Sequence, residues 1–418
     1  MKRIINLFST LTLSAVVLAS CYQPASSNNP PPVPPVPPEP QKTEVDFSVN
    51  YNQDKLTEES AEYTKNDITV TAIYDDDSKA TVTDWTVEPA LPYTLNSGKN
   101  VFTFTRKGKT QTLVVYKASQ TTTDNITDNG DGTITFGDYA QTAYVPYPNQ
   151  EFSDKPAKNG WYIGSDGNYY GKAGSDYYSV KPLVWDVYTE NYNGNKLLVT
   201  HNVIYGGILY SEATKNRTIN EKTVYPNNYE FSNLRAFLNG KTLYLDDGTT
   251  SDKYKNSNFL NMAFTEAAQN KILTTAIKND GNSSNDPTNP NWSRIDGTKG
   301  NDDDGNPKTD PTGKTIYTSS DTEDKVFALS IYDCTNKQYG VASGCDGNST
   351  NLNRKVNDFS TALGVTKDTD NNGNYMIRTP YYKQDDMIRY VQVGHCYQSE
   401  TIANSVSMGI VPAIVISK

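Results

Sequence analysis

Apolar and polar residues alternate along residues 44–118 in short runs that turn residues separate. One such run extends from Ile68 to Tyr74, and the acidic turn 75–78 follows it. A period of two, with a turn every eight to twelve residues, is typical of two packed antiparallel sheets. The pattern therefore predicts an all-β sandwich over residues 44–118.

Residues 133–418 mix strand and helix patterns, which predicts a larger α+β domain. Short apolar runs predict buried strands at residues 183–187, 196–200, 324–330 and 409–416. Ser232 is a favourable N-cap and Gly240 a favourable C-cap, so we expect a helix between them. A further helix is predicted from about Asn258 to Ile272.

Three polar stretches separate or interrupt these regions. Residues 21–43 contain many prolines, which lock the backbone and favour an extended polyproline II tether. Residues 119–132 are rich in Thr, Asp, Asn and Gly and are expected to be a linker. Residues 279–323 contain few apolar side chains, so they are predicted to be a mobile or loop-like insertion in the second domain.

Residues 1–20 have the pattern of an export signal. Lys2 and Arg3 precede an apolar run that is shorter than the roughly 20 residues a membrane-spanning helix needs. The signal ends in the sequence LASC at Cys21, which resembles the lipobox of bacterial lipoproteins. We therefore expect cleavage before Cys21, acylation of this cysteine and firm membrane anchoring through more than one acyl chain. The alternative is a plain export signal that a cysteine follows by chance.

Charge and cysteine content narrow the expected partners and compartment. The formal net charge is −10 at pH 7, whereas nucleic acids and anionic lipid headgroups require clustered Lys and Arg. Neither is expected as a partner. Cys334 and Cys345 flank a loop that contains Gly, Asn and Ser, so a disulfide between them is one of two open alternatives in an oxidising compartment. That pairing would leave Cys396 unpaired.

Two parts of the chain resemble known families. The segments VTAIYDDDSKATVTDWTV and LNSGKNVFTFTRKGKTQTLVVY resemble the bacterial Ig-like repeats of surface proteins, which implies a spacer or an adhesive module. Between Ile134 and Ser417 the segments ITFGDYAQT, KPLVWDVYTENYNGNKLLVT, YEFSNLRAFLNG, NMAFTEAAQNKI, DKVFALS and GIVPAIVIS follow in order. They resemble the family called domain of unknown function 6273, often seen in lipoproteins of spirochaete type.

The second resemblance implies no established function. An aromatic element of that family, W-W-L-R-S-P, corresponds here to YMIRTP, in which Arg378 and Pro380 match and both tryptophans are replaced. The departure puts any stacking role of those aromatic residues in doubt. The layout of helices and strands is similar to C-type-lectin-like folds, and this step is an analogy of fold only.

Tyrosine is the residue type in excess, with 30 in 418 residues. Tyrosines give broad contact area in binding surfaces, but they also fill the cores of β-rich proteins, and both interpretations stay open. The segment from 375 to 405 is the best candidate for a ligand-facing surface. Its candidate residues are Tyr375, Arg378, Tyr381, Tyr382, Tyr390 and Tyr397.

Candidates for metal binding and catalysis are weak. Asp368, Asp370 and Asn372 match the start of a calcium loop, but position twelve is Thr379 instead of Glu, and such clusters also form ordinary turns. His395 and Cys396 are neighbours, so on a strand they would point to opposite faces. We therefore predict no enzyme, no metal and no cofactor.

Together these patterns predict a lipid-anchored protein of the cell envelope, placed at the outer membrane or cell surface. An Ig-like spacer would carry a second domain that binds a glycan or a host protein. The alternatives are an extracytoplasmic enzyme on a lectin-like scaffold and a purely structural envelope lipoprotein.

Overall fold

The computed structural model describes residues 42–58, 60–119, 124–145, 149–279, 319–336, 339, 350–381 and 384–418. Cys21 with the export signal, most of the proline-rich segment, residues 280–318 of the predicted insertion, and Cys345 lie outside the described residues. Within the described ranges, no helix has both the length and the apolar character needed to cross a membrane.

The protein is β-rich and is built from several sheets. Strands account for 45% of the structure and helices for 14%. The first eight strands are β1 (Glu44–Tyr51), β2 (Glu62–Tyr63), β3 (Ile68–Tyr74), β4 (Lys79–Val82), β5 (Thr86–Glu88), β6 (Tyr93–Thr94), β7 (Gly98–Arg106) and β8 (Lys109–Lys117). They include two three-stranded antiparallel sheets, β1-β3-β4 and β5-β7-β8.

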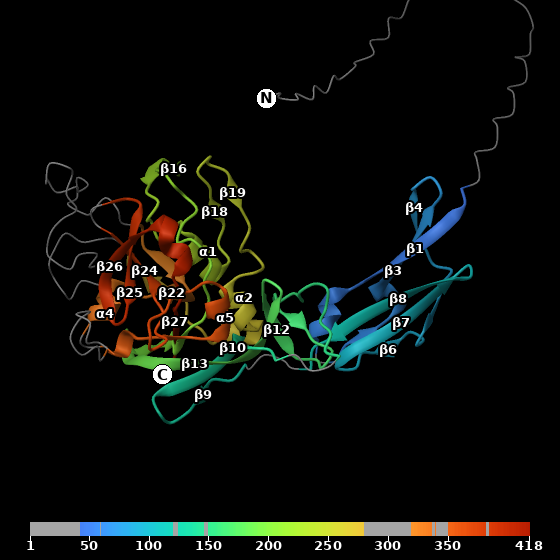
Figure 1. Cartoon of the computed structure of the whole chain (residues 1–418), viewed down its shortest axis with the longest axis horizontal. Helices are drawn as coiled ribbons and strands as arrows, with labels where there is room; N and C mark the ends of the chain where they lie inside the picture. Colours follow the sequence, from blue (N-terminus) through green and yellow to red (C-terminus); the bar gives the residue numbers. More distant parts are fainter. Residues whose placement is uncertain are drawn as a thin grey trace, which may run out of the picture. The chain divides into compact units, whose positions relative to one another are not determined.

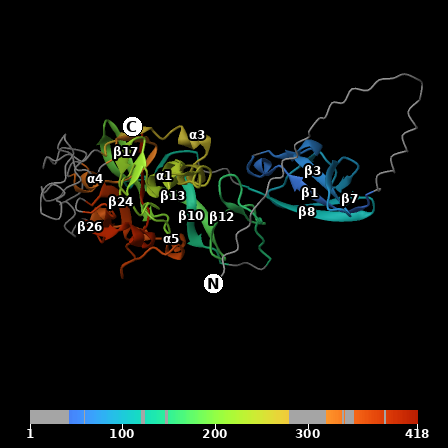
Figure 2. The ribbon, with the colours of Figure 1, turned by 90° about the horizontal axis from the view of Figure 1, so that it is seen from above.

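These two sheets pack face to face, with β1 and β3 in one layer and β7 and β8 in the other (Figure 2). Every second residue of β7 is buried or nearly so, as expected when one face of a strand covers a core. Phe47 and Val70 from the first sheet join Phe102, Phe104 and Val115 from the second in that core. The alternation that the sequence showed is thus the inward and outward alternation of a two-layer sandwich.

An eight-stranded antiparallel sheet forms the centre of the following region, which we call the head (residues 124–418). Its main path runs β11-β12-β13-β14-β27-β22. β10 joins this path at β13, as Figure 1 shows, and β9 pairs with β10. The strands are β9 (Thr127–Asp128), β10 (Thr133–Ala143), β11 (Tyr162–Ile163), β12 (Tyr169–Ala173), β13 (Asp176–Tyr192), β14 (Asn195–Thr200), β22 (Val326–Ala328) and β27 (Pro412–Ile416).

The middle strands of this sheet are buried on both faces. Successive side chains of a strand point to opposite faces, and in β14 Leu198 joins one apolar cluster while Leu197 and Val199 join another. In β27, Ile414 and Val415 divide between the clusters in the same way. The continuous apolar runs predicted as buried strands therefore serve two cores at once, one on each side of the sheet.

Short helices cover one face of the sheet. Leu234 and Phe237 of α1 (Asn233–Asn239) and Phe259 of α2 (Phe259–Ala263) lie in the cluster that contains Leu198. As predicted, Ser232 caps α1 by accepting a hydrogen bond from the backbone N–H of Arg235, and Gly240 ends it with a left-handed φ of 67°.

The second predicted helix is two helices. Phe264 ends α2 in an extended conformation, and the side chain of Thr265 then caps α3 (Glu266–Gln269) by accepting a hydrogen bond from the N–H of Ala268. A threonine can end one helix and begin another because its hydroxyl competes for free backbone groups.

The opposite face of the sheet is covered by a three-stranded antiparallel sheet, β24 (Tyr375–Pro380), β25 (Met387–Gln392) and β26 (His395–Thr401), together with α4 (Ile331–Thr335). The remaining strands are β15 (Asn202–Val203), β16 (Arg217–Ile219), β17 (Lys222–Val224), β18 (Leu243–Tyr244), β19 (Thr250–Ser251), β20 (Thr275–Ile277), β21 (Thr322–Asp324) and β23 (Lys355–Val356). The remaining helices are α5 (Asp358–Ala362) and the 3-10 turns Gln53–Thr57, Lys65–Asp67, Thr350–Leu352 and Ile402–Ser407.

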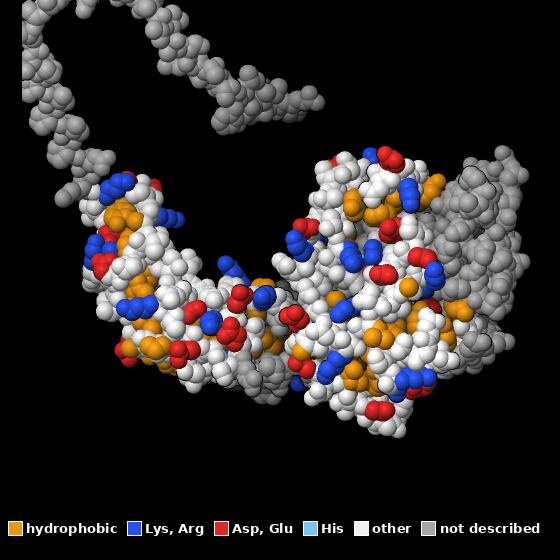
Figure 3. Space-filling model, turned by 180° about the vertical axis from the view of Figure 1, so that it is seen from behind, with side chains coloured by type: hydrophobic (Ala, Val, Ile, Leu, Met, Phe, Trp, Pro, Cys, Tyr) orange, Lys and Arg blue, Asp and Glu red, His pale blue; other side chains and the backbone are white. Residues whose placement is uncertain are grey.

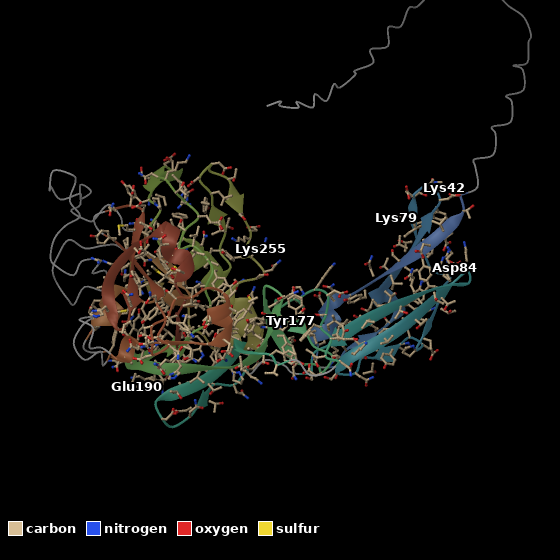
Figure 4. The ribbon with its side chains drawn as sticks, in the orientation of Figure 1. Lys42, Lys79, Asp84, Tyr177, Glu190 and Lys255 are labelled. Atoms are coloured by element: carbon tan, nitrogen blue, oxygen red, sulfur yellow. The ribbon has the colours of Figure 1, made fainter. Side chains whose placement is uncertain are left out.

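Many of the tyrosines are core residues. Tyr63, Tyr139, Tyr210, Tyr229 and Tyr375 are among the largest fully buried side chains of the described residues. Others pack against aromatic neighbours, as Tyr177 (labelled in Figure 4) does by stacking on Phe152 with ring centroids 3.7 Å apart. The excess of tyrosine therefore reflects packing to a large extent.

A buried ion pair joins the layers of the head. The Arg378 Nη1 atom, on β24, lies 2.6 Å from the Asp333 Oδ2 atom on α4, and both side chains are at most 3% exposed. The same Asp333 oxygen accepts hydrogen bonds from the backbone and hydroxyl of Ser330, which caps α4. Arg378 also donates to the carbonyl of Ala328, at the end of β22. Burial lowers the pKa of the Arg378 guanidinium, but the charge and hydrogen bond of Asp333, together with Tyr192 and Tyr229, outweigh burial and raise this pKa.

The cysteines differ from the predicted pairing. Cys334 lies on α4 as a buried thiol within the second apolar cluster, so the predicted Cys334–Cys345 disulfide is wrong. Cys396, which that pairing would have left over, is the disulfide-bonded cysteine, and its partner lies outside the described residues. Cys334 faces the core because α4 packs its apolar side against β24 and β26.

Removing one partner of the buried ion pair should destabilise the head strongly. Arg378→Met leaves the Asp333 carboxylate buried without its counter-charge, and we expect a loss of about 3–5 kcal/mol in the free energy of unfolding. Urea titration of the full chain measures this. Lys253→Gln, which breaks the exposed ion pair with Glu212, is the control and should cost less than about 1 kcal/mol. Equal losses for the two variants would contradict the assignment.

The two described cysteines should react differently with alkylating reagents. Burial, with Asp333 next, raises the pKa of the Cys334 thiol, so little of the reactive thiolate forms at neutral pH. We expect iodoacetamide to modify Cys334 only after denaturation, and Cys396 only after both denaturation and reduction. Peptide mass mapping measures both. Labelling of Cys396 in the non-reduced protein would be inconsistent with the disulfide.

Candidate functional site

Two of the residues predicted to face a ligand lie in the core. Tyr375 is 1% exposed, and its hydroxyl donates a hydrogen bond to the carbonyl of Leu352. Arg378 is 4% exposed and is held by Asp333. The prediction that these two residues form part of a ligand surface is therefore wrong, because both are used to join β24 to its neighbours.

The other predicted residues have different surroundings. Tyr381 is half-buried, with the guanidinium of Arg389 4.7 Å from its ring centre. Tyr382 and the side chain of Tyr397 lie outside the described residues. Tyr390, on β25, lines a surface pocket, so among the described candidates it is the residue that the structure places at a cavity.

The predicted calcium loop is closed by its own hydrogen bonds. The Asp368 Oδ1 atom accepts from the backbone N–H groups of Asp370 and Asn372, and Oδ2 accepts from the Asn372 side chain. Burial tends to raise the pKa of Asp368, but the hydrogen bonds from Asn372 and Asp370 outweigh it and lower the pKa. These contacts are those of a tight Asx turn. In the described part of the chain, no cluster of three His, Cys, Asp or Glu side chains could hold a metal ion.

The pocket beside this turn has a volume of about 530 Å³, and we call it the polar pocket. Three successive segments meet there: the turn before β24, the hairpin β25–β26, and the 3-10 turn after β26. Its lining residues are Thr366, Lys367, Asp368, Asn374, Tyr390, Gln392, Val393, Glu400, Asn404, Val406, Ser407 and Met408.

Internal hydrogen bonds fix the walls of the polar pocket. The Glu400 Oε1 atom accepts from the backbone N–H of Thr401 at 2.8 Å and from the Asn404 amide at 3.1 Å. Thr366 donates to the carbonyl of Ser407 through both its backbone and its hydroxyl. The Asn374 amide donates to the Thr366 hydroxyl at 3.3 Å. The side chains are therefore held in place before any ligand binds.

Several polar atoms of these side chains remain available. Within the described ranges, no protein group is hydrogen-bonded to Glu400 Oε2 or to the second amide atoms of Gln392, Asn374 and Asn404. An amide offers both donors and an acceptor, and a carboxylate offers acceptors alone. The pocket thus presents a mixture of donors and acceptors at its surface.

Tyr390 supplies the aromatic wall of the pocket. Burial raises the pKa of its phenol, and the nearby charge of Glu400 raises it further, so the hydroxyl stays protonated at neutral pH. That hydroxyl lies 3.4 Å from the Gln392 carbonyl oxygen. The Tyr390 ring and the side chains of Gln392 and Glu400 therefore form one wall of the pocket. The ring face is apolar, and the side chains beside it can form hydrogen bonds.

A second cavity has a volume of about 710 Å³, and its lining includes Asn261, Phe264 and Gln269. The Gln269 amide already donates to the Asn261 side chain and to two backbone carbonyls, those of Leu260 and Phe264. Gln269 is therefore a poor ligand contact. We take the polar pocket as the candidate site because it combines an aromatic ring with available carboxylate and amide atoms.

The chain also contains a charged triad that the sequence did not reveal. Asp186 lies between His201, whose Nδ1 is 2.7 Å from Oδ1, and Arg354, whose Nη1 is 3.2 Å from Oδ2. A Ser–His–Asp enzyme needs a nucleophile at the other ring nitrogen. Among the described residues, the His201 ring has only the Asp186 contact. Cys396 cannot serve as a thiolate nucleophile while it is disulfide-bonded.

Most residues of the polar pocket were missed because they are ordinary polar residues without a characteristic spacing. The turn Val393–Gly394, which places Gln392 and His395 opposite one another, also gives no sequence signal, because its first residue is not the Asn, Asp or Gly that such two-residue turns favour. A hairpin tip is a common position for functional groups on a rigid frame.

Surface charge does not single out another site on the face that Figure 3 shows. Basic and acidic side chains are interspersed there over the described residues, without a large area of one sign. Such a surface gives no electrostatic guidance for a strongly charged partner. The local chemistry of the polar pocket is therefore the more informative feature.

The comparisons with known proteins identify the family of the region that contains this pocket. The family model described as domain of unknown function (DUF6273) matches residues 193–418, which include every residue that lines the polar pocket. No curated protein and no solved structure shows a significant similarity to this chain. Because the family match covers more than half of the chain, the protein belongs to the DUF6273 family.

Proposed function

We propose that this protein is a lipid-anchored component of the bacterial cell envelope whose polar pocket binds a carbohydrate. The observation that carries the proposal is the wall formed by Tyr390, Gln392 and Glu400, with an aromatic ring beside unpaired amide and carboxylate atoms. A sugar presents hydroxyl groups that donate and accept hydrogen bonds, together with apolar C–H faces. Planar polar side chains and a tyrosine ring match both features.

In the proposed architecture an anchor, a tether and a spacer precede the head in the chain. Acylation at Cys21 would anchor the chain, residues 21–43 would act as a tether, and residues 44–118 would form an Ig-like spacer. Support for the spacer comes from its two packed antiparallel sheets and their alternating burial. The lipobox-like sequence LASC supports the anchor. This arrangement would display the head at the outer membrane or cell surface.

The proposal is for a binding protein instead of an enzyme. Support comes from the disulfide at Cys396, which occupies its sulfur, and from the solvent-exposed position of His201, whose side chain is 53% exposed. Catalytic groups usually work in sites that exclude water. A pocket with fixed polar side chains and an aromatic wall needs no catalytic group to recognise a sugar.

Glu400→Gln should weaken carbohydrate binding. The substitution keeps the shape of the side chain but removes the charged acceptor, and a hydrogen bond to a charged group is worth about 1.5–3 kcal/mol. We therefore expect roughly ten- to hundredfold weaker binding of any glycan that a glycan array identifies for the full chain. Isothermal titration calorimetry measures the change.

The matched control is Glu190→Gln, because Glu190 is an exposed carboxylate of the head outside the polar pocket (labelled in Figure 4). Its binding should equal that of the unmodified chain. An array without any bound glycan, or equal binding by Glu400→Gln and the unmodified chain, would argue against the proposed site.

Cys21→Ser should abolish lipid anchoring. A serine has no thiol for thioether formation, so the chain would lose its acyl groups. We expect the unmodified protein to incorporate labelled palmitate and to partition into a detergent phase, and the variant to do neither. Protease treatment of intact cells should remove the head of the unmodified protein. Continued palmitate labelling of the variant, or complete protection from protease, would contradict anchoring or surface display respectively.

A further inference from the structure

Two exposed valines stand on the rim of the polar pocket. Val393 is 38% exposed and Val406 is 44% exposed, and both line the pocket. Large exposed hydrophobic side chains are few among the described residues: Val45, Val101, Ile126, Val145, Val393 and Val406. Single exposed valines are ordinary, but two in one pocket that is otherwise lined mainly by polar side chains add apolar surface to it.

Val393 occupies a backbone position that disfavours it. It has a φ of 45° and is followed by Gly394 with a φ of 75°, so the hairpin between β25 and β26 has the two left-handed residues of a type I′ turn. Asparagine or glycine is the preferred residue at the first position, and a β-branched residue is an outlier there. The turn therefore does not explain the valine, whereas its position at the pocket does.

The polar atoms of the same pocket limit the chemistry that fits. Glu400 Oε2 can accept a hydrogen bond, and the amide nitrogen of Gln392 can donate one. A ligand group that has a methyl, an N–H and a carbonyl within a few bonds would use the valines, the carboxylate and an amide at once. An acetamido group has these three parts in that arrangement.

We propose that the polar pocket selects sugars that carry an acetamido group, with Val393 and Val406 contacting the acetyl methyl. This inference rests on the proposed carbohydrate binding and adds the substrate class. Glu400 accepts a hydrogen bond from the acetamido N–H, and the amide nitrogen of Gln392 donates one to the acetamido carbonyl. Tyr390 contacts the C–H face of the sugar ring. Sugars without the acetamido group leave the two valines facing water.

The test compares two trisaccharides that differ in this group. Tri-N-acetylchitotriose and cellotriose share the same backbone of β1,4-linked glucose-type rings, and only the first carries acetamido groups. We expect the full chain to bind the first at least tenfold more tightly in calorimetric titrations. In saturation-transfer NMR the acetyl methyl protons should receive the largest transfer.

Val393→Asn tests the residue assignment without endangering the fold. Asparagine suits the type I′ turn better than valine does, so the variant should melt at the same or a higher temperature. We expect its affinity for tri-N-acetylchitotriose to fall about tenfold, towards that of cellotriose. Val406→Thr should also lower the affinity for tri-N-acetylchitotriose. Val145→Asn, at an exposed valine outside the pocket lining, is the control and should change neither property.

The outcomes separate this inference from the function on which it rests. Equal affinity for the two trisaccharides, lost in Glu400→Gln, would overturn the acetamido selectivity and keep the carbohydrate site. Preference for a sugar with another apolar group, such as a 6-deoxy sugar, would also overturn the acetamido selectivity while keeping the carbohydrate site. Unchanged selectivity in Val393→Asn would overturn the role of the valine. Binding of neither trisaccharide, nor of any glycan on an array, would overturn both proposals.

Discussion

The burial of β14 and β27 on both faces is the constraint that arranges the rest of the head. Leu197, Leu198 and Val199 are each completely buried, and the five residues of β27 are all buried as well. A strand of this kind cannot lie at the surface, since each exposed aliphatic side chain would cost about 1.5–3 kcal/mol. One face therefore requires α1 and α2, and the other requires the sheet β24-β25-β26 with α4. The hairpin that carries the polar pocket is part of this covering layer.

The ion pair between Arg378 and Asp333 fixes the covering layer in one place. Apolar packing alone is tolerant of small displacements, whereas two buried charges need a defined geometry to offset their loss of hydration. Asp333 meets this requirement by also accepting hydrogen bonds from Ser330. Arg378 meets it by donating a hydrogen bond to the carbonyl of Ala328. The pair thus connects β24, α4 and the end of β22. Arg378 is one of the two positions that match the aromatic element of the family, and its environment here is that of a structural residue.

Local features were predictable from the sequence, and long-range ones were not. The capping residues Ser232 and Gly240 act within one helix, and β27 is one continuous apolar run. Local sequence patterns therefore predicted both the helix and the strand. Arg378 was misassigned to a surface because its partner lies 45 residues away, and no short pattern shows a buried carboxylate. The disulfide was misassigned because loop spacing says nothing about which cysteine faces the core. Tyr390, one of the residues predicted to face a ligand, lies at a cavity, whereas Glu400 and Asn404 carry no spacing signal.

The position of the polar pocket follows from the difference between the side chains that join the layers of the head and those that reach solvent. The side chains that join the layers, such as Tyr375 and Arg378, are satisfied internally and have no capacity left for a ligand. Groups that can contact a ligand remain at the end of the sheet β24-β25-β26, at the turn Val393–Gly394 and on Glu400. There the backbone is paired, but the side chains reach solvent. Buried positions such as Arg378 therefore hold the layers together. The residues at the hairpin tip and its neighbours, which we propose contact the ligand, lie outside these buried contacts.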